Sequence, residues 1–136
     1  MAIALLSVGL LGLLVFLLGA NVSRERRSVT ITQHEAEADP ASALRRAIRA
    51  HGNCIEYVPM LSLMILALGL RLPLLPGWIA ALMLAAVASR YIHAVGILTG
   101  GSVHEANALK KIGAAGTYLT GAVLSVVLII RAIALF

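Results

Sequence analysis

The stretch Arg49-Ala-His-Gly-Asn-Cys-Ile-Glu-Tyr-Val-Pro59 carries polar side chains directly into the apolar run Met60-Leu-Ser-Leu-Met-Ile-Leu-Ala-Leu-Gly-Leu70. An apolar run of this kind indicates a membrane-spanning helix. At about 100° per residue, the side chains of Arg49, Asn53 and Glu56 fall within about 60° of one another on a helix. A carboxylate at that depth is unfavourable unless it is paired or faces a polar cavity. The spacing therefore predicts a polar site where this helix enters the membrane.

The composition places the whole chain in a membrane. Its 136 residues are 60% hydrophobic and 12% charged, with a mean hydropathy of +0.96. A soluble domain of this length cannot bury so much apolar surface, so we expect one all-α integral membrane domain over residues 1–136. Basic residues that flank spans and meet anionic lipid account for the net charge of +5, so nucleic acid is not an expected partner. Cys54 is the only cysteine, which excludes an intrachain disulfide and a thiol-rich metal site.

Apolar runs predict a four-transmembrane-helix bundle with spans at about residues 2–20, 53–70, 79–98 and 112–130. The first run lacks a preceding Lys or Arg, unlike a secretory signal, so we expect it to be a retained span. Residues 21–39 should form a polar loop. Asp39-Pro40 predicts the start of a helix that runs to about residue 70 and is kinked at Pro59. A turn with two prolines over residues 71–78 should lead into the third span.

Lys and Arg residues are distributed unequally between the two sides of this bundle. Two of them, Arg71 and Arg131, lie on the side of the chain termini. Eight lie on the other side, in the first and third loops between the predicted spans: Arg24, Arg26, Arg27, Arg45, Arg46, Arg49, Lys110 and Lys111. Cytoplasmic loops carry the excess of basic residues in membrane proteins. We therefore expect both polar loops in the cytoplasm and both termini on the non-cytoplasmic side.

The third predicted span contains Arg90 and His93, which share one helix face. Arg90 is the only base well inside an apolar run and Glu56 is the only such acid, so we expect the two to form an ion pair. That pair could belong to a functional pocket or could simply stabilise helix packing. A metal site formed by His51, Asn53 and His93 is disfavoured, because these residues lack a convincing supporting shell.

The motif Arg49-x-x-x-Asn53-x-x-Glu56-x-x-Pro59 resembles the signature of the MAPEG superfamily, the membrane-associated proteins in eicosanoid and glutathione metabolism. Arg90-x-x-His93 is similar to a third-span motif of several members. The four-span plan agrees as well, so the resemblance covers essentially the whole chain. The short length and the Gly-Asn-x-x-Glu-Tyr form look most like the small bacterial branch, which implies the bacterial inner membrane.

The resemblance implies a homotrimer in membrane lipid, with glutathione bound as a co-substrate between subunits. It implies a glutathione transferase or peroxidase that acts on lipophilic small-molecule electrophiles. The positions that match the family's glutathione contacts are Arg49, Asn53, Glu56, Tyr57, Arg90, His93 and Tyr118. Arginine and carboxylate groups suit this ligand, because glutathione carries two carboxylates and one ammonium.

Two departures from the family pattern concern catalysis. Active members generally place a Tyr where this chain has Ile97, and they carry a thiolate-stabilising Arg near the end of the third span or in the following loop. Here no Arg occurs between Arg90 and Arg131, which leaves Lys110, Lys111 or a first-loop arginine as substitutes. A first alternative is therefore a non-catalytic lipid- or ligand-binding membrane protein of the same fold. A second is a small transporter that uses Glu56 for proton coupling, although the chain lacks an inverted repeat.

Overall fold

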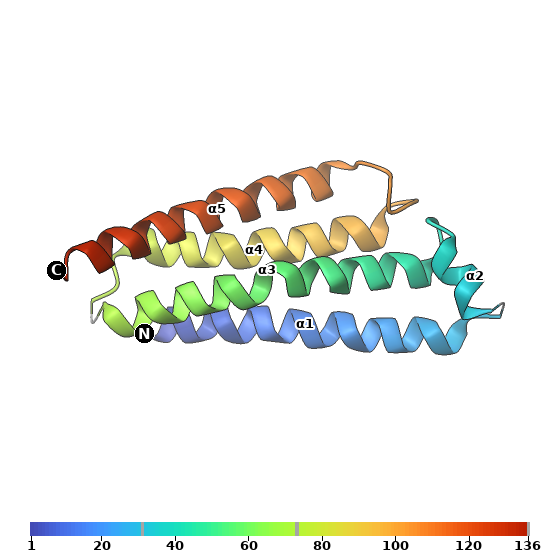
Figure 1. Ribbon diagram of the computed structural model, residues 1–136, viewed down its shortest axis with the longest axis horizontal. Helices are drawn as coiled ribbons and strands as arrows, with labels where there is room; N and C mark the ends of the chain where they lie inside the picture. Colours follow the sequence, from blue (N-terminus) through green and yellow to red (C-terminus); the bar gives the residue numbers. More distant parts are fainter. Residues whose placement is uncertain (31, 73, 136) are drawn as a thin grey trace.

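The computed structural model describes residues 1–30, 32–72 and 74–135, and its regular structure is helical. The elements are α1 (Ala2–Ser28), α2 (Gln33–Ala38), α3 (Ala43–Arg71), α4 (Gly77–Thr99) and α5 (Ala108–Ile133). Figure 1 shows the four long helices lying alongside one another, with α2 at one end and both chain termini at the other. Each long helix is long and apolar enough to cross a membrane, as the sequence predicts.

The first connection contains more helix than its sequence predicts. α1 continues to Ser28, well past the predicted end of its apolar run. Val22 on this extension packs with Ala36 of α2 and Leu44 of α3 in a small separate core. α2 lies within the stretch expected to be a loop, and Thr32 and Glu35 form a reciprocal capping box at its start. Burial of Ala36 and this capping explain why the polar segment is helical.

The N-cap residue of α3 is Ser42, three residues after Asp39, the predicted N-cap. The Asp39 carboxylate accepts a hydrogen bond from the Ala41 N–H at 2.9 Å, so it caps a turn instead of the helix. The Ser42 hydroxyl caps α3 by accepting from the Arg45 N–H at 3.0 Å. Pro59 lies inside α3, and Figure 1 shows α3 changing direction near its middle, as expected for a proline within a helix.

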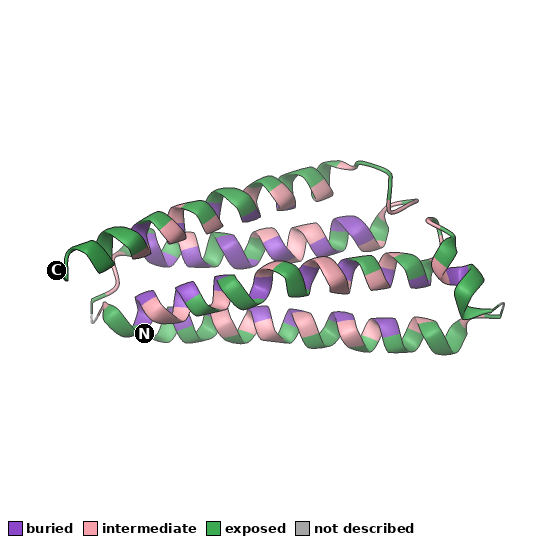
Figure 2. Cartoon of the chain, viewed as in Figure 1, coloured by how far each residue is buried: buried purple, intermediate pink, exposed green. Residues whose placement is uncertain are grey.

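The core lies between α1, α3 and α4, with α5 packed mainly on α4. Figure 2 shows buried residues on the inward sides of the helices and exposed residues along their outer sides. The outer sides are themselves apolar, as shown by Phe16 on α1 at 79% exposure and Leu119 on α5 at 66%. Exposed apolar faces along helices of this length suit contact with lipid or with another membrane helix.

Glycines bring α5 close to α4. A Cβ atom on Gly113 would lie 2.5 Å from the His93 backbone nitrogen, and one on Gly96 would lie 2.6 Å from the Lys110 nitrogen. Small residues of this kind allow two membrane helices to approach closely. This contact fixes the first turns of α5 against the last turns of α4, which is the level at which Arg90 and His93 lie.

The connection from α3 to α4 is short. Pro76 is the N-cap residue of α4, and Trp78 in its first turn is 57% exposed. Pro73, the other proline expected in this turn, lies outside the described residues, as do residues 31 and 136. An exposed Trp at a helix end is typical of a membrane interface.

Candidate functional site

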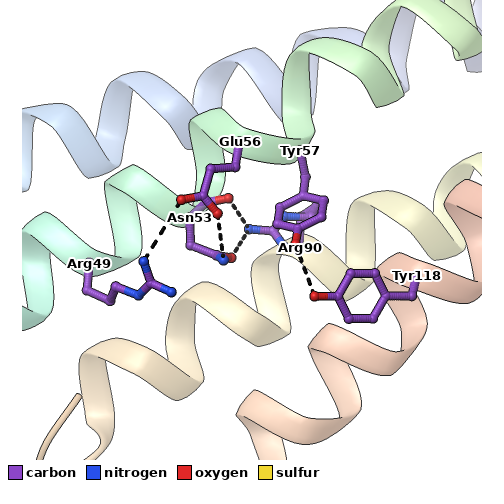
Figure 3. Close-up of polar contacts among 6 residues, drawn as sticks. All are labelled: Arg49, Asn53, Glu56, Tyr57, Arg90 and Tyr118. Atoms are coloured by element: carbon purple, nitrogen blue, oxygen red, sulfur yellow. Dashed lines mark hydrogen bonds and ion pairs between the residues drawn. The ribbon is translucent and has the colours of Figure 1, made fainter. Parts of the chain in front are cut away.

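Three polar side chains on one face of α3 form the outer part of the site (Figure 3). Arg49 Nη1 lies 3.9 Å from Glu56 Oε1, and Asn53 Nδ2 donates to Glu56 Oε2 at 3.4 Å. The side chains of Arg49 and Glu56 are 56% and 52% exposed. The shared helix face predicted from the spacing is therefore present, and its ion pair is loose and open.

Arg90 of α4 forms the inner part of the site and is only 1% exposed. Its Nη2 donates to Asn53 at both the backbone oxygen, at 3.2 Å, and Oδ1, at 2.9 Å. Its Nη1 donates to Thr117 Oγ1 of α5 at 3.4 Å. One guanidinium thus joins three helices, α3, α4 and α5, in the middle of the bundle.

The expected ion pair between Arg90 and Glu56 is not among the ion pairs of the described residues, and that expectation is corrected. Glu56 has Arg49 and Asn53 as its partners, whereas Arg90 is bound to Asn53 and Thr117. The physical reason is that Arg49 lies two turns before Glu56 on the same helix, so its long side chain reaches the carboxylate. The two Asn53 carbonyl oxygens accept from Nη2 of the buried guanidinium instead, while its Nε has no hydrogen-bond partner among the described residues. Asn53 therefore connects the exposed pair to the buried cation.

Two tyrosines complete the inner part of the site. The hydroxyl groups of Tyr57 and Tyr118 are 3.0 Å apart, and their rings pack edge to face with centroids 5.7 Å apart. The Arg90 guanidinium carbon lies 5.2 Å from the centroid of the Tyr57 ring, a cation–π contact. Figure 3 shows both tyrosines beside Arg90, one from α3 and one from α5. Tyr118 is 62% exposed, so the pair reaches the outer surface of the chain.

His93 is oriented by the start of α5. Its Nδ1 lies 2.9 Å from the Lys110 carbonyl oxygen, and because a carbonyl only accepts, this nitrogen must carry the proton. His93 lines a small cavity of about 40 Å³ together with other members of the predicted set, namely Asn53, Tyr57, Arg90 and Tyr118, and with Ala114 and Thr117. All seven predicted residues thus lie in one connected cluster. Thr117 of α5 also belongs to it through its contact with Arg90, and the sequence motifs did not predict it as a site residue.

An apolar cavity adjoins the cluster between α3 and α5. It has a volume of about 310 Å³ and shares Glu56, Tyr57, Thr117 and Tyr118 with the polar site. Its remaining lining runs toward the other end of the bundle and consists of Met60, Leu61, Met64, Gly121, Ala122 and Ser125. A lipophilic group in this cavity would therefore lie directly beside the polar side chains.

The Lys110 side chain is hydrogen-bonded within the loop between α4 and α5. Its Nζ donates to the Ser102 carbonyl at 2.8 Å and to the Glu105 carbonyl at 2.5 Å. Ile97, where active MAPEG members generally carry a Tyr, is buried in the core at 4% exposure. The inner part of the site therefore contains the tyrosine hydroxyls and the Arg90 cation. The Lys110 ammonium is bound in the loop between α4 and α5 instead.

The described residues contain no group of three His, Cys, Asp or Glu side chains placed to hold a metal ion. The His51 ring lies against Gly19 of α1, and Cys54 is fully buried in the core.

The MAPEG family model matches residues 4–130 of the chain. This range takes in every residue of the site described above. No curated protein and no solved structure matches the chain.

Proposed function

Because the chain belongs to the MAPEG family of membrane proteins in eicosanoid and glutathione metabolism, we propose that it binds glutathione and uses it on lipophilic electrophiles. The chain is a multi-pass integral membrane protein with four long apolar helices. The reaction class proposed is transfer of the glutathionyl group or reduction of a lipid hydroperoxide. The observation that carries the proposal is the open pair of Arg49 and Glu56 above a buried arginine.

Glutathione presents two carboxylates, one ammonium and a thiol. Arg49 offers a guanidinium to a carboxylate, and Glu56 offers a carboxylate to the ammonium. These two groups are 3.9 Å apart and half-exposed, so a ligand can replace their weak mutual interaction without disrupting the helix. Arg90 is a positioning residue in this scheme, because its Nη groups are already bound to Asn53 and Thr117.

The tyrosine pair is our candidate for the group that faces the thiol. A cysteine thiol with a pKa of about 8.5 needs a nearby donor or cation to be mostly ionised at neutral pH. The Tyr57 and Tyr118 hydroxyls and the adjoining apolar cavity provide donors beside a place for the electrophile. In transfer, the sulfur loses its proton and forms a bond to an electrophilic carbon, while the bond to the leaving group, such as halide, breaks and the halide departs with the proton as the acid. In peroxide reduction, two glutathione molecules become the disulfide while the hydroperoxide becomes an alcohol and water.

Calorimetry with glutathione on the purified protein in detergent tests the binding step. We expect Arg49→Ala and Glu56→Ala each to weaken binding about tenfold or more, since each removes a charge-assisted contact. Arg27→Ala, an exposed arginine on α1, is the matched control and should bind as the parent does. Equal affinity for the parent and both site variants would refute the proposal.

A second candidate function is glutathione or lipid binding without catalysis. It is favoured by the buried Ile97 and by the absence of arginine between Arg90 and Arg131 in the sequence. The same calorimetry followed by turnover assays with an aryl halide and a lipid hydroperoxide separates the two candidates. Binding with turnover supports the enzyme, and binding without turnover supports the alternative. Proton coupling at Glu56 has less support, because this carboxylate already has a cation and an amide as partners.

We further propose a homotrimer in the bacterial inner membrane with both termini on the non-cytoplasmic side. Support for assembly comes from the exposure of Arg49, Glu56 and Tyr118 on the surface of one chain. Charged groups at the level of a span are favourable when protein covers them. A neighbouring chain would cover this side and complete the pocket.

A further inference from the structure

A second cavity opens between α3 and α5 at the end of the bundle that carries both termini. It has a volume of about 420 Å³ and its wall is mostly apolar. The lining comes from the last turns of both helices and the residues after them: Ala67, Leu68, Arg71, Leu72, Leu128, Arg131, Ala132, Ala134 and Leu135. Figure 1 shows these two helix ends on the side away from α2. The glutathione site proposed above shares none of these residues.

Two arginines give this cavity a positive rim. Arg71 ends α3 and Arg131 lies in the last turn of α5, and both are exposed. Among the described residues, neither side chain makes an ion pair or a hydrogen bond. The six acidic residues all lie before position 57 or at Glu105, so no acidic side chain is available at this end of the bundle. Two cations therefore face a cavity that no acidic side chain neutralises.

Neighbouring aromatic and apolar side chains indicate the depth of this cavity in the membrane. Trp78 is 57% exposed one residue into α4, and Leu74 in the preceding turn is 90% exposed. Exposed Trp at a helix end marks the level of lipid headgroups. Arg71 precedes this turn directly, so its guanidinium lies at the same level, while Leu68 and Leu128 lie deeper along the helices.

The two arginines also run against the general charge bias of membrane proteins. The expected orientation puts them on the non-cytoplasmic side, where Lys and Arg are generally sparse. Each lies in the last turn of its helix, where a cation interacts favourably with the helix dipole. Two guanidinium groups at one opening also suit a phosphodiester.

We propose that this cavity binds an anionic glycerophospholipid of the leaflet at this end of the bundle. The phosphodiester lies between Arg71 and Arg131, and an acyl chain follows the apolar wall toward Leu68 and Leu128. A zwitterionic lipid brings an ammonium to the same two cations and is disfavoured. A free phosphate satisfies the arginines and leaves the apolar wall unused, which makes the lipid the better complement to the whole cavity.

Native mass spectrometry of the full chain released from neutral detergent tests the proposal. Dioleoyl phosphatidylglycerol is titrated against dioleoyl phosphatidylcholine, which has the same acyl chains. We expect preferential retention of phosphatidylglycerol, reduced about fivefold by Arg71→Gln or Arg131→Gln and about twentyfold by both changes. Arg27→Gln with Arg45→Gln removes two exposed charges from the opposite end and should leave retention unchanged.

A second variant separates a built cavity from general electrostatic attraction. Ala132→Phe keeps both arginines and fills part of the cavity, so we expect it to lower phosphatidylglycerol retention as well. Equal retention by the parent and the double arginine variant would overturn the proposal. So would competition by millimolar inorganic phosphate, which would assign the site to free phosphate. A change of oligomeric state in Ala132→Phe with unchanged lipid retention would assign the cavity to a second copy of the chain.

Discussion

At the scale of single residues, Arg90 determines how the site is organised. It is buried, and its three hydrogen bonds join Asn53 of α3 to Thr117 of α5. Asn53 in turn donates to Glu56, which faces Arg49. The outer, ligand-accessible charges are therefore held by an inner cation that the ligand need not touch. This division of roles follows from burial, since a guanidinium in an apolar bundle must use its donors within the protein.

Arg90→Ala should destabilise the fold by about 2 kcal/mol. Hydrogen bonds between membrane helices contribute about 0.6 kcal/mol each on average, and three are removed while a space is left behind. The measurement is the unfolding free energy in mixed micelles containing increasing SDS, followed by circular dichroism. Arg26→Ala, half-exposed on α1, is the control and should change the stability by less than about 0.5 kcal/mol. Equal loss in both variants would contradict the role given to Arg90.

The tyrosine pair should show a small but measurable coupling. Tyr57→Phe and Tyr118→Phe each remove one hydroxyl of the 3.0 Å contact, and the double variant removes both. We expect a coupling free energy of about 0.5 kcal/mol from the double-mutant cycle in the same unfolding assay. Strictly additive effects of the two changes would mean that the hydroxyl contact contributes nothing to stability.

The sequence predicted which side chains lie close together better than it predicted their pairing. Helical spacing was sufficient to place Arg49, Asn53 and Glu56 on one face, because they belong to one helix. Contacts between helices depend on the relative rotation and depth of α3 and α4, which spacing within one helix does not determine. The sequence therefore indicated that Arg90 needs a buried partner but not that Asn53 would be that partner.

At the scale of elements, the close approach of α4 and α5 depends on glycine. Gly113→Ala should destabilise the fold by about 2 kcal/mol, because the added methyl group would overlap the backbone at His93. Gly9→Ala on α1 is a matched control, since a Cβ there has nothing within 4 Å. The control should be neutral or stabilising by up to about 1 kcal/mol. SDS unfolding measures both, and equal stability of the two variants would contradict the packing argument.

α2 should loosen in acid. The Glu35 carboxylate accepts hydrogen bonds from the Thr32 hydroxyl at 2.6 Å and the Thr32 N–H at 3.1 Å, and these lower the pKa of Glu35. A lowered pKa means that the cap is fully stabilising above the ordinary carboxyl pKa of about 4.3 and is lost as the pH falls through the lowered value. Amide hydrogen exchange over residues 33–38 should accelerate more in the parent than in Glu35→Gln after correction for intrinsic rates. The same acceleration in both proteins would rule out this carboxylate as the cause.

The four long helices were predictable because length and apolar composition decide them. Their polar ends were less predictable. Asp and Ser are both favoured N-cap residues, so the residue types at Asp39 and Ser42 do not decide which of the two begins α3. α2 carried its own signal, since Thr32 and Glu35 have capping-box spacing. Its polar composition was nevertheless typical of a loop, and the packing of Ala36 against Val22 and Leu44, which favours the helix together with the capping box, is not visible in the sequence.

At the scale of the whole molecule, α3 and α5 line two separate cavities that differ in their chemistry. The polar cluster with Arg49 and Glu56 lies toward the end that carries α2, and the cavity bounded by Arg71 and Arg131 lies at the other. Apolar side chains line both cavities along the same two helices. The proposed orientation therefore assigns the glutathione site to the cytoplasmic half of the membrane and the lipid site to the opposite leaflet.

Labelling of introduced cysteines tests this orientation in intact cells. Leu74→Cys lies in the α3–α4 turn at 90% exposure, so a membrane-impermeant maleimide should label it from outside the inner membrane. His104→Cys lies in the exposed loop before α5 and should be labelled only in inverted vesicles. The parent chain is the control, because Cys54 is fully buried and should stay unlabelled in both. Labelling of His104→Cys from outside, with Leu74→Cys protected, would show that the orientation is the reverse of the one proposed. The eight basic residues of the two polar loops would then face outward, against the usual charge bias.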